Sequence, residues 1–349
     1  MKTSAALSAL PLVASRVDVL AQGSSTGSIA ISRGRDVREA VLRAVQTIGG
    51  MDAFVSPGDT VLIKPNASFS RTPGTGANTS PEVATAVANL AFESGASRVV
   101  FADHPINKPG DVTLKINGLG EAASRTGAEF AILGDRSDFE AVAIERGLVL
   151  GEVEVAKICR EADVIINLPV LKHHDATGSS VGMKNLMGLV YDRKAFHRLG
   201  LESAIADLSL KLRPDLTVVD ATTVLATNGP RGPGELVKLS TVVAGTDQVA
   251  VDVASISLMS SLGYRGFDMD HHNRYISLAS QLGIGDGDPE SVQSRIVRVE
   301  AGGEAPGPAR EGSLRSKPSW LPYLSLSAAS LIVGAIALIY DRRKRGDGS

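Results

Sequence analysis

Cysteine is almost absent from this chain, and its scarcity removes several classes of site. Cys159 is the single cysteine among 349 residues. One thiol cannot form an internal disulfide, a thiolate zinc site or an iron–sulfur cluster. Cys159 lies in a helix-like run, Val155–Arg160, where a small buried hydrophobic side chain is a better interpretation than a reactive thiol.

Aromatic residues and net charge are also scarce. Phe, Trp and Tyr make up 4% of the chain, and the formal net charge is −2. So few rings provide no platform for stacking bases, and a nearly neutral chain has no overall field that attracts a polyanion. We therefore expect no nucleic-acid partner.

Short β-branched apolar runs alternate with helical patterns from residue 28 to residue 300. Strands that are apolar throughout and separated by helices are typical of a parallel sheet buried on both faces. We therefore expect an α/β domain over residues 28–300, with a largely parallel sheet and helices on both faces, in one body or two lobes. The expected strands are Ser28–Ile31, Thr60–Ile63, Arg98–Ala102, Glu129–Leu133, Asp163–Leu168, Leu216–Asp220 and Ser240–Ala244. The expected helices are Val37–Ile48, Pro81–Ser94, Leu119–Thr126, Leu201–Leu212 and Val249–Met259.

The two ends of the chain indicate attachment to a membrane. Residues 320–340 contain no charged residue and are long enough to cross a hydrocarbon core of roughly 30 Å as a helix. A basic tail, 341–349, follows, and by the positive-inside rule it favours a cytoplasmic C-terminus. Residues 1–27 resemble an export signal and leader, and 301–319 read as a flexible stalk. We expect a single-pass protein whose main domain is extracytoplasmic and whose partner is the lipid bilayer. The alternative is that residues 320–340 form a buried core helix.

Ligands of parallel sheets gather where the strands end, and polar side chains follow the expected strands at those points. The densest set follows Asp163–Leu168. A helix beginning near Ser180 would offer free amides, hydroxyls and ammonium groups to an anion. The spacing is not that of a Walker phosphate loop, and a glycine-rich turn with solvated lysines is the alternative. The candidate residues of this segment are Lys172, His174, Ser179, Ser180, Lys184 and Asn185.

Further candidates follow other strands. Lys64 and Asn66 flank a proline at a strand end, and Arg231 lies in a Gly/Pro loop as a candidate anion clamp. Asp220 ends a strand. Asp247 suits a helix cap, and Asp252 in an apolar helix needs a partner such as Lys64 or Lys184. Each has a structural alternative: an edge lysine, a turn asparagine, an ordinary loop or a cap.

Histidine and aspartate clusters offer two metal interpretations, neither of which we adopt. Asp268, Asp270 and His272 alternate along one side of an extended segment, but no fourth ligand is evident. The adjacent His173 and His174, followed by an aspartate, point apart in a regular strand. We predict no metal site, leave the cofactor open, and interpret the isolated His104 and His197 as structural.

Five motifs in order resemble one family. They are Ile63-Lys64-Pro65-Asn66, Thr79-Ser80-Pro81-Glu82, the block from Lys172 to Gly188, Asp220 with Asn228–Gly232, and Asp247–Asp252. Together they resemble domain of unknown function family 362 over about residues 28–260. The resemblance implies functional positions but no reaction. Many members carry a cysteine-rich ferredoxin-like module, whereas this chain has no Cys-x-x-Cys. His174 matches the family's histidine, and His173 is additional.

Three functions fit these residues. The first is an enzyme that acts on a small phosphorylated or carboxylated substrate, in which lysines bind charge and His174 is the acid/base, oriented by Asp220 or Asp252. Proton transfer or isomerisation suits this set better than hydrolysis, because no nucleophile-elbow motif is present. The second is a non-catalytic anion-binding protein at the membrane. The third is a redox protein with a bound cofactor or metal.

Overall fold

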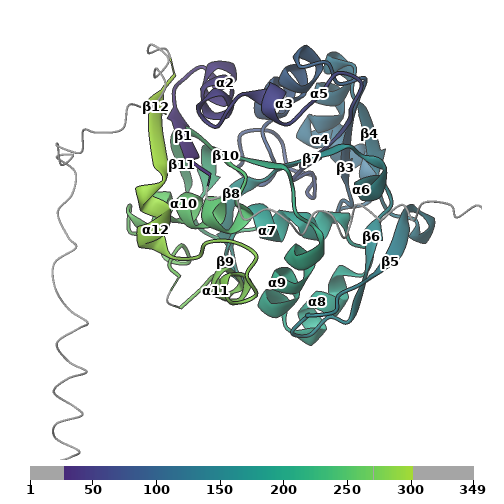
Figure 1. Cartoon of the computed structure of the whole chain (residues 1–349), viewed down its shortest axis with the longest axis vertical. Coiled ribbons are helices and arrows are strands. Elements are labelled where there is room, and N and C mark those ends of the chain that lie inside the picture. The colour runs from purple at the N-terminus through teal and green to yellow at the C-terminus, as the bar shows by residue number, and fades with distance from the viewer. Residues whose placement is uncertain (1–26, 270, 302–349) are drawn as a thin grey trace, which may run out of the picture. The chain divides into compact units, whose positions relative to one another are not determined.

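The computed structural model describes residues 27–269 and 271–301, which build a ten-stranded sheet with helices on both faces (Figure 1). The main strand order is β12-β1-β11-β10-β7-β2-β3-β4, and β8 and β9 extend it from β10. The strands are β1 (Ile29–Arg33), β2 (Thr60–Pro65), β3 (Arg98–Asp103), β4 (Glu129–Ile132), β7 (Val164–Leu168), β8 (Val170–His174), β9 (Gly178–Ser180), β10 (Leu216–Leu225), β11 (Leu236–Gly245) and β12 (Ile296–Glu300).

Most neighbouring strands of this sheet run parallel. β7, β2, β3 and β4 pair in parallel in succession, as do β10 with β7 and with β8, and β1 with β12. β11 is antiparallel to both β1 and β10, and β9 is antiparallel to β8. The mixed α/β fold with a mostly parallel sheet is therefore confirmed.

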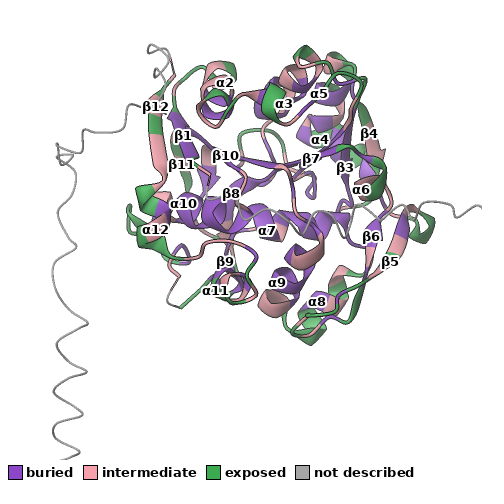
Figure 2. Ribbon diagram, in the orientation of Figure 1, coloured by how far each residue is buried: buried purple, intermediate pink, exposed green. Residues whose placement is uncertain are grey.

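Alternate side chains of the strands enter two separate cores. Val61 and Ile63 of β2 pack in the core on one face of the sheet, whereas Leu62, between them, packs in the core on the other face. Period-two alternation places successive strand residues on opposite faces, so a strand buried on both faces is apolar throughout. Figure 2 shows the resulting buried sheet between helices whose outer faces are exposed.

One core is covered by α2 to α5 and the other by α7 to α12. The first group is α2 (Val37–Thr47), α3 (Pro81–Glu93), α4 (Gly110–Asn117) and α5 (Leu119–Thr126). The second is α7 (Gly182–Asn185), α8 (Arg193–Leu199), α9 (Leu201–Lys211), α10 (Gln248–Ser260), α11 (Arg274–Gln281) and α12 (Pro289–Ser294). A short helix α6 (Ile158–Glu161) and a hairpin of β5 (Phe139–Ala143) and β6 (Glu152–Ala156) complete these elements, with single turns at 51–53, 136–138 and 186–189.

Helix starts carry the expected side-chain caps. Ser80 caps α3, with Pro81 at its first position, and Asp247 caps α10 by accepting from the amides of Val249 and Ala250. Such caps satisfy amides that have no partner inside the helix. One predicted helix start is wrong: Ser180 belongs to strand β9, and helix α7 begins at Gly182.

The predicted membrane segments fall on residues that are not described. Residues 1–26 and 302–349 hold nearly all of the predicted export signal and stalk and the whole of the predicted transmembrane helix and basic tail. Within 27–269 and 271–301, no helix is long and apolar enough to cross a bilayer.

Candidate functional site

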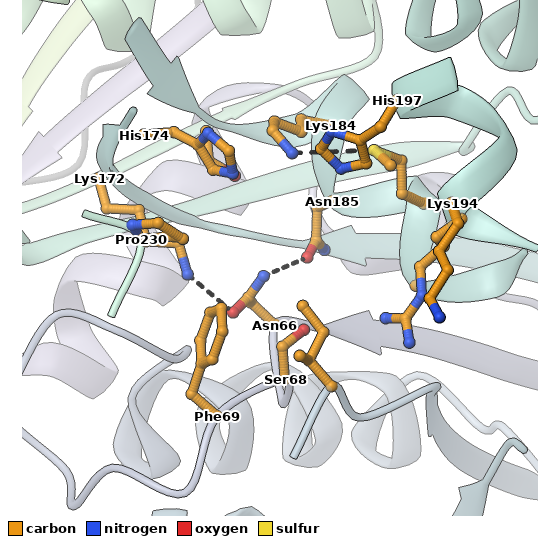
Figure 3. Close-up of a pocket in the computed structure, with 15 residues that line it drawn as sticks. Asn66, Ser68, Phe69, Lys172, His174, Lys184, Asn185, Lys194, His197 and Pro230 are labelled. Atoms are coloured by element: carbon orange, nitrogen blue, oxygen red, sulfur yellow. Dashed lines mark hydrogen bonds between the residues drawn. The ribbon is translucent and has the colours of Figure 1, made fainter. Parts of the chain in front are cut away.

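A pocket of about 350 Å³ opens beside the C-terminal ends of β2 and β8 and the helices α7 and α8 (Figure 3). Six residues predicted to form the site line it together: Asn66, Lys172, His174, Ser180, Lys184 and Asn185. They come from segments more than a hundred residues apart, because parallel strands bring their C-terminal ends to one edge.

Lys172 is buried in the wall of this pocket. Its side chain projects from β8, its Nζ donates to Asn66 Oδ1 at 3.0 Å and to the Ala77 carbonyl, and it lies 4.9 Å from the Phe69 ring centroid. Burial, followed by the charge of Lys184, lowers the pKa of Lys172 to about 7. This amine therefore exchanges its proton near neutral pH.

A chain of three amides fixes the floor of the pocket. Asn66 Nδ2 donates to Asn185 Oδ1 at 3.1 Å, and Asn185 Nδ2 donates to Asn167 Oδ1 at 2.8 Å. Asn167 Nδ2 ends the chain on the Gly182 carbonyl at 2.9 Å. The direction of these bonds leaves the Asn66 oxygen facing the Lys172 ammonium, which this oxygen stabilises.

Lys184 extends from helix α7 into the same pocket. The contact of its Nζ is the weak acceptor Met187 Sδ at 3.8 Å, and it forms no ion pair with any residue of 27–269 and 271–301. Burial lowers the pKa of Lys184 to about 8. An ammonium without a carboxylate partner is open to a ligand's negative charge.

His174 presents a neutral ring to the pocket. Burial, followed by Lys184 and Lys172, lowers its pKa to about 2. The Ala176 amide donates to its Nδ1 at 3.1 Å, so the ring proton resides on Nε2. Asp175 Oδ1 also lies 3.2 Å from Nδ1, but this carboxylate is exposed and free to turn to water, whereas the amide hydrogen is fixed. His174 is therefore arranged as an Nε2–H donor.

Asp252 occupies the helix start that was expected to bind an anion. Its Oδ1 accepts from the Gly182 amide at 2.8 Å and its Oδ2 from the Met183 amide at 3.1 Å. The prediction that these amides are free is therefore wrong. The predictions that Asp252 pairs with a lysine and that it orients His174 are also wrong, because its carboxylate binds the two amides. Burial raises the pKa of Asp252 to about 7. Its position indicates that it anchors α7.

Lys64 lies behind the pocket. Its Nζ is 3.1 Å from Asp103 Oδ1, and both side chains are buried. Burial lowers the pKa of Lys64, which the neighbouring carboxylate partly opposes. The Gly188 backbone crosses this pair so closely that an added Cβ would lie 2.0 Å from Asp103 Oδ1. The pair supports the pocket floor.

Four other predicted residues do not line the pocket. Asp220 accepts from the Ser80 amide at 2.7 Å and from Thr222, so it joins β10 to the start of α3 and does not orient His174. Asp247 caps α10, and the Ser179 hydroxyl donates a hydrogen bond to Asn273 Oδ1. Arg231 is exposed on a loop, and the neighbouring Pro230 lines the pocket. The expected convergence of strand-end lysine, histidine and carboxylate groups in one cleft therefore holds for Lys172, His174 and Lys184 but not for Lys64, Asp220 and Asp252.

Helix α8 contributes lining residues that the sequence did not indicate. Arg193, Lys194 and His197 all face the pocket, although His197 had been interpreted as structural. They lie on one side of the helix because residues three and four apart are neighbours on its surface. No strand end precedes α8, so the strand-end rule could not have found them; only their i, i+1, i+4 spacing offered a signal. Ser68, Phe69, Ile106, Met187 and Gly188 complete the lining.

Metal-ligating side chains do not converge in the described residues. No group of three or more His, Cys, Asp or Glu side chains in 27–269 and 271–301 is placed to hold a metal ion. Asp268 contacts the ring of His272 at 2.8 Å, and Asp270 is outside the described residues.

Comparisons with known proteins identify the family. The chain is 30% identical to a thylakoid-associated protein of Synechocystis over 221 residues. This aligned region is 60% of this chain and 65% of that protein. Two solved structures are similar at low identity. The lactate racemase apoprotein of Thermoanaerobacterium thermosaccharolyticum has 15% identity and a TM-score of 0.38, covering 62% of this chain and 54% of that one. A protein of Thermotoga maritima has 14% sequence identity and a TM-score of 0.40, and the match covers 70% of this chain and 58% of that protein. These scores carry no conclusion about function. Residues 61–257 match the family described as domain of unknown function (DUF362), and the chain belongs to that family.

Proposed function

We propose that the pocket binds a small anionic molecule and catalyses proton transfer on it. The observation that carries this proposal is the charge of the lining: Lys172, Lys184, Arg193 and Lys194 face the pocket, and no described lining residue is a carboxylate. None of these cations forms an ion pair with a described residue, and a bound carboxylate or phosphate would supply the opposite charge. A volume of about 350 Å³ suits a small molecule.

Lys172 is the group best suited to move a proton. Asn66 Oδ1 and the Ala77 carbonyl each accept one of its N–H bonds. The third position at Nζ holds the lone pair of the neutral amine or the proton of the ammonium. With a pKa of about 7, the amine takes a proton from the ligand and returns it at another atom without needing extreme pH.

The other groups bind and orient. The Lys184 ammonium anchors the anionic group, and the Nε2–H of His174 donates to a ligand oxygen. His174 does not suit the acid/base role expected from the sequence, because its pKa of about 2 keeps the ring neutral and its Nδ1 is occupied by an amide. This assignment moves the acid/base role to Lys172.

Anion binding is tested by thermal unfolding of the full chain with phosphate and with a panel of small carboxylates. We expect at least one anion to raise the melting temperature. Lys184→Ala should abolish the rise, whereas Lys115→Ala, which removes an exposed lysine of α4, should retain it. The proposal fails if no anion stabilises the chain, or if both variants respond as the wild type does. Binding with no exchange of ligand hydrogens for deuterium would instead favour a non-catalytic binding protein.

The same proposal places the domain at a membrane, held by the predicted helix over residues 320–340. The relative's description as thylakoid-associated supports membrane association. The full chain should sediment with membranes after an alkaline carbonate wash, and a chain that ends at residue 301 should not. Release of the full chain by carbonate would contradict a spanning anchor.

A further inference from the structure

The cationic lining has two ends. Figure 3 shows Lys172 and Pro230 at one side of the pocket and Lys194 at the other, with Lys184 and His197 between them. The electrostatic effects follow the same order: the charge of Lys184 depresses the pKa of Lys172, and the charge of Arg193 depresses the pKa of Lys184. The cations of this row come from three elements: Lys172 from β8, Lys184 from α7, and Arg193 and Lys194 from α8.

Helix α8 holds the second end in place. Arg193 is half-buried, and its Nη1 donates to the His104 carbonyl at 2.6 Å, which fixes the guanidinium at the pocket wall. Neither Arg193 nor Lys194 forms an ion pair within residues 27–269 and 271–301, whereas Arg198 on the same helix pairs with Asp192 at 2.9 Å. The unpaired cations of α8 are those that line the pocket.

Asp175 and Asp103 act on Lys184 and Arg193 from outside the lining, but no described lining residue carries a negative charge. A ligand with one anionic group would pair with one end of this row and leave the other without an anion. Met187, Phe69, Ile106 and Pro230 supply apolar lining. A molecule with an anionic group at each end and a short carbon body would pair with both cationic ends and cover these apolar side chains.

We infer that the ligand of this pocket is a small dianion with separated charges, a dicarboxylate or a phosphocarboxylate, and that Arg193 and Lys194 of α8 recognise its second anionic group. The inference rests on the proposed anion binding and deepens it. Lys184 binds the first group beside Lys172, and α8 sets specificity by requiring the second.

The test is calorimetric titration of the full chain in detergent. Malonate, succinate, glutarate and adipate are each compared with the monocarboxylate of the same carbon number, and phosphonoacetate and 3-phosphonopropionate test the phosphocarboxylate arm. We expect one dianion to bind at least about tenfold more tightly than its monoanionic match. Affinity should depend on chain length, because the Arg193–His104 hydrogen bond holds the guanidinium at the pocket wall.

Variants assign the preference to α8. Lys194→Gln and the double variant Arg193→Gln with Lys194→Gln should reduce the preference for the dianion, the double variant to about twofold, because the second anionic group loses its cationic partners. Lys194→Gln alters only an exposed side chain, so it remains informative if the double variant does not fold. Arg198→Gln is the matched control and should keep the full preference.

Each outcome separates the two proposals. Equal affinity for monoanions and dianions, or a preference that survives in Lys194→Gln and in the folded double variant, would overturn the assignment to α8 and leave anion binding intact. No binding of any probe would overturn both.

Discussion

Lys172 is buried and Lys184 is partly buried, and neither forms an ion pair with a carboxylate in the part of the chain that the structure describes. Their pKa values, about 7 and about 8, lie well below the ordinary value because burial disfavours the charged form. A bound anion favours the protonated form, so binding and protonation of these amines are coupled.

This coupling predicts the pH dependence of affinity. For an anion whose own charge is constant above pH 6, affinity should be highest below pH 7 and fall by about tenfold or more between pH 7 and pH 9, because the amines lose their protons. Calorimetry at pH 8.5 in buffers of different ionisation enthalpy should show proton uptake on binding. Lys184→Arg should weaken the pH dependence, since a guanidinium remains charged. Affinity that is constant over this range would contradict the assigned role of the amines.

Gly188 tests the support behind the pocket. Its missing Cβ makes room for Asp103 Oδ1 and Lys64 Cε, which an added Cβ would meet at 2.0 Å and 2.6 Å. Gly188→Ala should lower the free energy of unfolding by about 1–3 kcal/mol, because both neighbours are buried and have no room to move. Denaturant unfolding measures this. Gly151→Ala, where nothing lies within 4 Å, is the control and should be nearly neutral.

At the scale of elements, helix α7 depends on a carboxylate from helix α10. Asp252 accepts the Gly182 and Met183 amides in a buried setting. Asp252→Ala should cost about 2–4 kcal/mol of unfolding free energy, because two buried donors lose their acceptor. Asp288→Ala removes the exposed cap of α12 and should cost about 1 kcal/mol or less. Equal losses in the two variants, measured by denaturant unfolding, would contradict the anchoring role.

Elements with strong local patterns were predictable. The run Thr60–Ile63 predicted β2, and Ser80 with Pro81 predicted the start of α3, because each signal is contained in a few adjacent residues. The sequence of Gly178–Ser180 predicts the start of a helix near Ser180 and no strand. The segment is strand β9, because its partner is β8, and that pairing carries no local signature in three small residues.

The candidate site was predictable in part for the same reason. Asn66 follows β2, and Lys172 lies in β8, just beyond the end of β7, so the convergence of strand ends brings them together. Asp220 was expected at a strand end, but β10 continues to Leu225, and the carboxylate accepts from the Ser80 amide. The residues of α8 enter the pocket through tertiary packing of a helix, which the rule does not address.

At the scale of the whole molecule, the two amines predict how stability changes with pH. In the unfolded chain lysines have a pKa near 10.4, so between pH 7 and pH 10 the unfolded state binds more protons than the folded state does. The two lysines therefore make the free energy of unfolding rise as pH rises above 7. Anion affinity has the opposite trend, because it falls over the same pH range. Denaturant unfolding of the ligand-free wild type and Lys172→Met should show the rise with a smaller slope in the variant. Identical slopes would contradict the depressed pKa.

The central claim is that a small anion occupies the pocket between Lys172 and Lys184. Crystals grown with selenate offer the most direct measurement, because selenium gives an anomalous signal at the anion. We expect a peak in the pocket with a selenate oxygen about 3 Å from Lys184 Nζ. Selenate found only at other surfaces, with the pocket open to solvent in the same crystal, would contradict the account.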